Sequence, residues 1–120
     1  MSDSPLLEPD AIANLRSINP DDNGSFIGQL VDLFLSDAPL RIAEMETALA
    51  QNRGADLGHL AHAVKGSAAN FGATRLVALA FELEQLGKSS QLALAREKLA
   101  ALHAEFVHTR PALEALKPRA

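Results

Sequence analysis

Apolar residues recur at intervals of three and four through most of the chain, the spacing that places them on one face of an α-helix. Glycine and proline interrupt this pattern and divide it into five or six helical stretches. The first stretch is short, from Pro9 to Ile18, and a turn at 19–24 follows it. The second stretch is predicted over about 25–36, and Pro39 predicts a kink or a fresh helix start after it.

The pattern continues to the end of the chain. After Pro39, the third stretch runs up to a turn at 52–54. The next two stretches are predicted from 56 to about 70 and from 74 to 87, and the last begins at about 89 or 90. Gly72 is expected to supply a left-handed stop, and Thr74 is a plausible N-cap. Pro111 is expected to kink or end the last stretch, leaving Leu113 and Leu116 on a short segment.

Short connections between amphipathic helices favour antiparallel neighbours. The composition agrees with helices, because the chain contains 22 Ala and 20 Leu but only 11 Val, Ile and Thr together. We therefore predict an all-α fold, an antiparallel up-down four-helix bundle with a short additional N-terminal helix. One domain is expected over residues 1–120, with 1–8 as a loose N-terminal segment.

Composition also excludes several classes of function. The chain has no cysteine for a disulfide or a thiolate metal site, and its net charge of −4 is unlike that of a nucleic-acid binder. No apolar run approaches the roughly 20 residues needed to span a membrane, and the acidic N-terminus is unlike a secretory signal. We expect a cytoplasmic protein, and a monomer because no second exposed apolar face is evident.

The stretch at 56–70 carries an unusual outer face. With Leu57 at zero and about 100° per residue, His62 lies about 140° away and is expected to point outward. Gly58 at i−4, Gly66 at i+4 and Ala69 at i+7 are placed on the same outer face. A glycine inside a helix is roughly 0.5–1 kcal/mol less favourable than alanine. Two glycines on the turns beside His62 therefore predict a surface without large side chains, which a partner could approach closely.

The chemistry of this face is that of a nucleophile. A neutral imidazole is a competent nucleophile, and Lys65, one turn along the helix, could balance the charge of a dianionic group placed on the ring of His62. The two histidines His59 and His62 have no third ligand placed to complete a metal site, so no metal is expected.

The residues that begin at His62 resemble the signature of a known family. Residues 62–73, His-Ala-Val-Lys-Gly-Ser-Ala-Ala-Asn-Phe-Gly-Ala, resemble the signature H-x-L-K-G-S-S/A-x-x-x-G-A of histidine-containing phosphotransfer (HPt) domains. The similarity extends over about residues 60–88 and includes Leu83-Glu84 in the next stretch. Val64 replaces the usual leucine, which is a conservative change in packing.

The resemblance implies a phosphorelay protein. His62 would accept a phosphoryl group, through Nε2, from the aspartate of a response-regulator receiver domain and pass it to another receiver domain. Lys65 would balance the charge and Gly66 would leave room. Either Glu84 or Gln85 would bond the other imidazole nitrogen, and the sequence leaves both possible.

The candidate partner-docking residues are Gly58, His59, Ala69, Glu84 and Gln85. The charges of Glu82, Glu84 and Lys88 are otherwise interpreted as a solvated helix face. No cofactor is implied for this chain, and Mg²⁺ is expected only on the receiver. The receivers, one of which could belong to a hybrid sensor histidine kinase, and the direction of phosphoryl flow are not specified by the sequence.

Two other functions were weighed. A histidine kinase dimerisation helix would have an acidic residue and then a proline after the histidine, where Ala63 and Gly66 stand. The sequence also contains no glycine-rich nucleotide loop, so neither ATP binding nor self-phosphorylation is expected. The alternative that remains is a helical adaptor that docks receiver domains without phosphotransfer.

Overall fold

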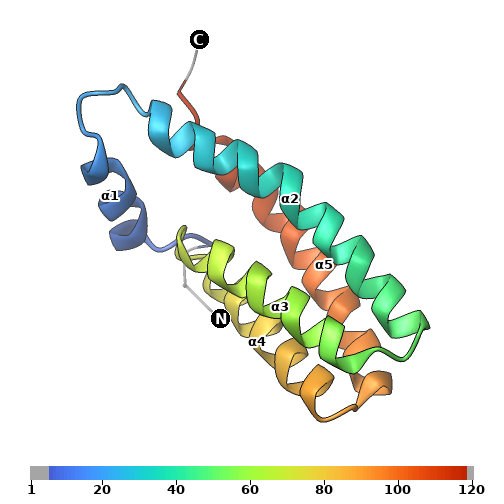
Figure 1. Ribbon diagram of the computed structural model, residues 1–120. Coiled ribbons are helices and arrows are strands. Elements are labelled where there is room, and N and C mark those ends of the chain that lie inside the picture. The colour runs from blue at the N-terminus through green and yellow to red at the C-terminus, as the bar shows by residue number, and fades with distance from the viewer. Residues whose placement is uncertain (1–5, 119–120) are drawn as a thin grey trace.

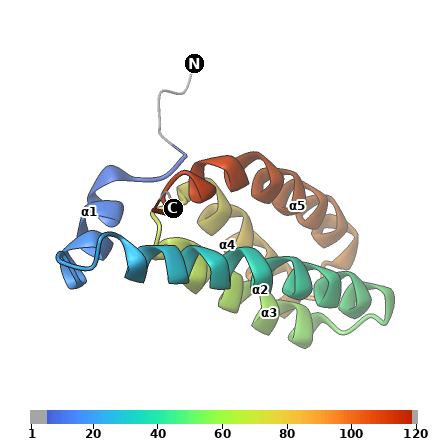
Figure 2. The same ribbon diagram turned by 90° about the horizontal axis from the view of Figure 1, so that it is seen from above.

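The computed structural model describes residues 6–118, and the secondary structure in this range is entirely helical. The helices are α1 (Pro9–Ile18), α2 (Ser25–Ala50), α3 (Gly54–Ala69), α4 (Thr74–Lys88) and α5 (Leu92–Glu114). Each of the four longer helices packs against its neighbour in sequence, and α2 also packs against α5, which closes the bundle (Figure 1). Seen from above, α1 lies at one end of the bundle (Figure 2). The predicted fold class is confirmed.

Two predicted breaks in the helices are wrong. Helix α2 continues through Pro39, with no fresh start there, and α5 continues through Pro111 to Glu114. A proline removes one backbone donor and crowds the preceding turn. Both prolines are exposed, so their rings lie on the solvent side of the helices. Ile42 and Leu113 beyond them are buried, and this packing on the core keeps the helices continuous.

The turns at the helix ends follow their residue types. The Asp22 carboxylate accepts hydrogen bonds from the amides of Gly24 (3.0 Å) and Phe26 (2.8 Å) at the start of α2. Gly72 has φ +62°, the left-handed conformation predicted for the end of α3. Thr74 is the first residue of α4 and not its N-cap, a position that Ala73 occupies without a side-chain hydrogen bond.

The segment before α1 is attached to the bundle. The Glu8 amide donates a hydrogen bond to the Gly72 carbonyl (3.0 Å), and Leu7 packs against the core. The prediction of a loose segment over residues 1–8 is therefore wrong for Leu7 and Glu8, and residues 1–5 lie outside the described residues. An added Cβ at Gly72 would lie 2.6 Å from the Cβ of Glu8, so this contact requires glycine.

An aromatic cluster joins three of the elements. The ring of Phe34 on α2 lies 5.6 Å from Phe71, just after α3, and 5.8 Å from Phe106 on α5. Aromatic pairs at this separation stabilise the core beyond their burial alone. Alanine and leucine fill most of the remaining interior. Within residues 6–118, none of the helices combines the length and the apolar character that crossing a membrane requires.

The backbones of α3 and α4 come into close contact at three glycines. A Cβ added to Gly87 would lie 2.6 Å from the carbonyl oxygen of Gly54 and 2.9 Å from the amide nitrogen of Gly58. Real Cβ atoms essentially never come so close to backbone atoms. The contact therefore sets the spacing of the two helices that carry the site described next.

Candidate functional site

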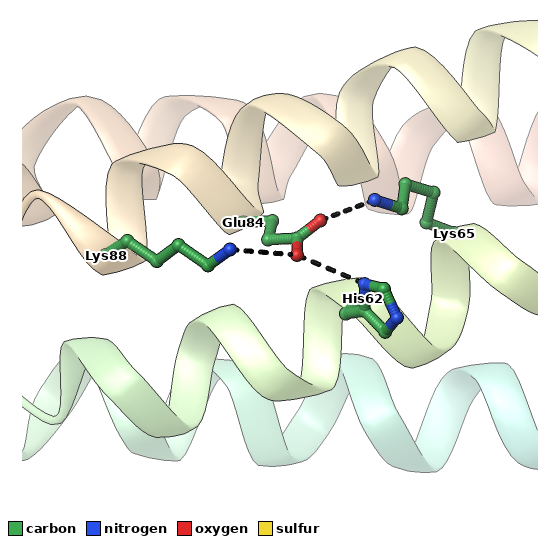
Figure 3. A network of polar contacts seen from close by, with 4 residues as sticks. All are labelled: His62, Lys65, Glu84 and Lys88. Atoms are coloured by element: carbon green, nitrogen blue, oxygen red, sulfur yellow. Dashed lines mark hydrogen bonds and ion pairs between the residues drawn. The ribbon is translucent and has the colours of Figure 1, made fainter.

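His62 projects from the outer face of α3. Its side chain is 67% exposed, which agrees with the outward orientation that the sequence predicts. Nδ1 lies 3.1 Å from Oε2 of Glu84 on α4. The ring is turned so that its second nitrogen, Nε2, points away from Glu84 (Figure 3). One ring nitrogen is thus held by the protein and the other is left open to an approaching group.

Glu84 is the centre of the polar network in Figure 3. Its side chain is only 8% exposed, and it contacts three basic side chains. The Nζ of Lys65 donates to Oε1 at 2.6 Å, and the Nζ of Lys88 lies 3.3 Å from Oε2, the oxygen that also faces His62. The hydrogen bond from Lys65 is the largest influence that lowers the pKa of Glu84 to about 2, against the opposing effect of burial.

The ionised state of Glu84 fixes the tautomer of His62. A carboxylate only accepts hydrogen bonds, so Nδ1 of His62 must carry the proton that lies between the two groups. The neutral imidazole then has its free lone pair on Nε2, the exposed nitrogen. The structure also decides between the two candidates on α4, because Glu84 bonds His62 and Gln85 is exposed.

Two interpretations from the sequence are corrected here. Glu84 and Lys88 are not simply part of a solvated helix face, because Glu84 is buried and Lys88 pairs with it. Burial also removes Glu84 from the candidate docking surface. The burial is possible because two ammonium groups and the Nδ1–H of His62 replace the water that the carboxylate loses.

Lys65 is held on the Nδ1 side of His62. Its ammonium group contacts Glu84 and lies 5.2 Å from the centroid of the Phe81 ring, and its side chain is 25% exposed. Phe81 is not among the site residues predicted from the sequence. The signal that could have found it is the spacing of Phe81, Glu84 and Lys88, which places all three on one face of α4.

The small residues around His62 differ in their surroundings. Gly66 is exposed, and an added Cβ would meet nothing within 4 Å. His59 and Ala69 are also exposed, as expected for residues near the site. Gly58 is buried against α4, so the prediction that it lies on the outer face is wrong, while its part in docking stays a prediction. A helical wheel gives the direction of Gly58 but not which flank of α3 is covered by α4.

The described residues contain no group of three or more histidine, aspartate or glutamate side chains that could hold a metal ion. A hollow of about 410 Å³ lies between α2 and α3, lined by His59, Leu60 and residues of α2 and the start of α3, but not by His62. The His62 side chain is instead 67% exposed to solvent. This arrangement suits the approach of another protein better than the enclosure of a small molecule.

The Glu84 network predicts a specific loss of stability in acid. The folded-state pKa lies below the ordinary value of 4.5, so the ionised carboxylate stabilises the fold fully above about pH 4.5. This contribution is lost as the pH falls from 4.5 towards 2. We expect the free energy of unfolding, measured by urea denaturation, to fall more steeply over this window in the parent protein than in Glu84→Gln. Parallel pH profiles for the two proteins would contradict the ionised network.

Comparisons with known proteins find a matching domain family and a similar solved structure. The sequence model of the Hpt domain matches residues 29–116. The crystal structure of histidine-containing phosphotransfer protein B (HptB) from Pseudomonas aeruginosa PAO1 is similar, with a TM-score of 0.83 and 27% identity. The similarity covers 93% of this chain and 94% of that chain. No curated protein matches the sequence at a significant level.

Proposed function

Because the chain belongs to the Hpt domain family, we propose that it is a phosphorelay protein that accepts a phosphoryl group on His62 from a receiver-domain aspartate and passes it to another receiver domain. The observation that carries this proposal is the orientation of His62. Glu84 holds Nδ1 at 3.1 Å, while Nε2 faces outward from a side chain that is 67% exposed. A nucleophile in this position is accessible to a reactive group on a second protein.

The proposed transfer is an in-line exchange of one bond for another. The lone pair of Nε2 forms the N–P bond while the bond between phosphorus and the aspartate oxygen breaks, and the electron pair leaves with the aspartate carboxylate. The Nδ1 proton stays on the ring throughout. The phosphorylated ring therefore carries a positive charge, which the ionised Glu84 beside Nδ1 stabilises. Return of the phosphoryl group to a receiver reverses the same steps.

Positioning is the main contribution that such a site can make. Phosphoryl transfer passes through a loose transition state, so catalysis depends on alignment and charge more than on covalent chemistry from the protein. Glu84 fixes the plane of the imidazole, and Gly66 leaves open space one turn from it. A partner's reactive carboxyl phosphate can then come into line with Nε2.

The direct test is phosphoryl uptake from a labelled partner. The protein is incubated with a phosphorylated receiver domain, and the label that it acquires is treated with acid and with base. We expect label that is labile in acid and stable in base, as a phosphorus–nitrogen bond requires. A chain that binds the receiver but acquires no label would be an adaptor, and the proposal of phosphotransfer would be wrong.

Gly66 provides a test of the space beside the nucleophile. Gly66→Leu is expected to slow transfer by about tenfold to a hundredfold, because the added side chain displaces the partner from its aligned position. The fold is expected to persist, since an added Cβ meets no neighbouring atom. Rates of label transfer and thermal unfolding measure the two effects. Ala104→Leu, at an exposed position on α5, is the matched control, and an equal rate in both variants would contradict the role of Gly66.

A further inference from the structure

The side chain of Lys65 is largely shielded from solvent. Lys65 and Lys88 both pair with Glu84, but their side chains are 25% and 61% exposed respectively. Lys65 also lies against an aromatic ring, because the ring centroid of Phe81 is 5.2 Å from its Nζ. A lysine side chain has many rotamers in water, so a fixed position needs more than one contact to hold it. Lys65 has two, the carboxylate and the ring.

We infer that Phe81 is a positioning residue of the His62 site, whose ring holds the ammonium group of Lys65 on Glu84. The negative face of an aromatic ring attracts a cation within about 6 Å of its centroid. Phe81 and Glu84 are three residues apart on α4, so one helix face presents both contacts to Lys65 across the interface with α3. Phe81 acts on His62 only through Lys65 and Glu84.

In this arrangement Lys65 acts on the Nδ1 side of His62, through Glu84, and not at the exposed Nε2. Its ammonium group lies on Oε1 of Glu84, while Oε2 of the same carboxylate faces Nδ1. Holding Lys65 there fixes the carboxylate that orients the imidazole. The effect on transfer rests on the proposed function, whereas the contact between Phe81 and Lys65 does not.

Phe81 is 49% exposed, so a partner could instead contact it directly. The two roles predict different kinetics. A docking residue changes the receiver concentration that gives half the maximal rate. A positioning residue changes the rate at saturating receiver and leaves that concentration unaltered. If Phe81 acts through Lys65, substituting Phe81 has no further effect on the transfer rate once Lys65 has been replaced.

The test compares Phe81→Leu with Phe81→Tyr, which keeps an aromatic face, and with Leu94→Ala, a control at a 50% exposed apolar residue of α5. The first measurement is the exchange of the lysine ammonium protons with water, followed by ¹⁵N NMR. We expect Phe81→Leu to speed exchange at Lys65 about two- to fivefold, the factor that an exposed cation–π contact supplies. Exchange at Lys88 is expected to stay the same, and Phe81→Tyr is expected to restore slow exchange at Lys65.

The second measurement is phosphoryl uptake from a receiver. Phe81→Leu is expected to lower the saturated rate by a similar factor of about two to five, and to lower it no further in a Lys65→Met background. Unchanged exchange at Lys65 in Phe81→Leu would overturn the inference, as would a change in receiver affinity alone. Faster exchange at Lys65 in a protein that acquires no label would support the contact while contradicting the proposed function.

Discussion

Replacing His62 with glutamine is expected to reduce labelling by a phosphorylated receiver to the background level. Glutamine keeps a polar side chain of similar size but has no imidazole nitrogen to attack phosphorus. The fold is expected to remain, because the His62 side chain is 67% exposed and surface substitutions usually change stability by about 0.5 kcal/mol or less. The measurement is the amount of acid-labile label after a fixed time, together with a thermal unfolding curve.

His59 provides the matched control for this substitution. It is exposed and lies one turn earlier on α3, without a hydrogen bond to Glu84. His59→Gln is expected to acquire label as the parent protein does, with at most a small change in receiver affinity. Labelling of His62→Gln at the rate of the parent protein would show that another residue accepts the phosphoryl group.

Gly87→Ala is expected to be strongly destabilising for a change of one methyl group. The new Cβ would lie 2.6 Å from the oxygen of Gly54 and 2.9 Å from the nitrogen of Gly58, and these backbone atoms cannot rotate away. Helices α3 and α4 must then move apart, at a cost of about 1–3 kcal/mol typical of overpacking. The same movement carries Glu84 away from His62, so we expect slower phosphoryl transfer as well.

Urea denaturation measures the stability, and Gly66→Ala is the control. Both changes add one methyl group inside a helix, but Gly66 has open space around it. Gly66→Ala is therefore expected to be stabilising by roughly 0.5–1 kcal/mol, the usual preference for alanine over glycine in a helix. Gly87→Ala as stable as the parent protein would mean that the glycine contact does not set the helix spacing.

The fold could be predicted because its main signals are periodic and local. Apolar spacing indicates every helix, and the glycine at position 72 is by itself enough to predict the left-handed turn there. The effect of Pro39 and Pro111 could not be predicted in the same way. Whether a proline ends a helix depends on where its ring points and on what the residues beyond it pack against. Those facts belong to the tertiary structure.

The site was largely predictable on α3, apart from the placement of Gly58, and only partly on α4. The position of His62 and the open space at Gly66 follow from helical spacing alone. Glu84 was one of two candidates, since choosing between it and Gln85 requires knowing how α4 is rotated against α3. The contact of Phe81 with Lys65 also joins two helices, and no pattern within one helix specifies such a contact.

The exposure of His62 has a consequence for signalling. A phosphoryl group on Nε2, on a side chain that is 67% exposed, would be accessible to any receiver that docks on this face. Net flux would then follow mass action, set by the concentrations of the phosphorylated and free receivers and by their affinities for this face. In that sense the protein would behave as a reversible exchange point, and the direction of the signal would be decided by its partners.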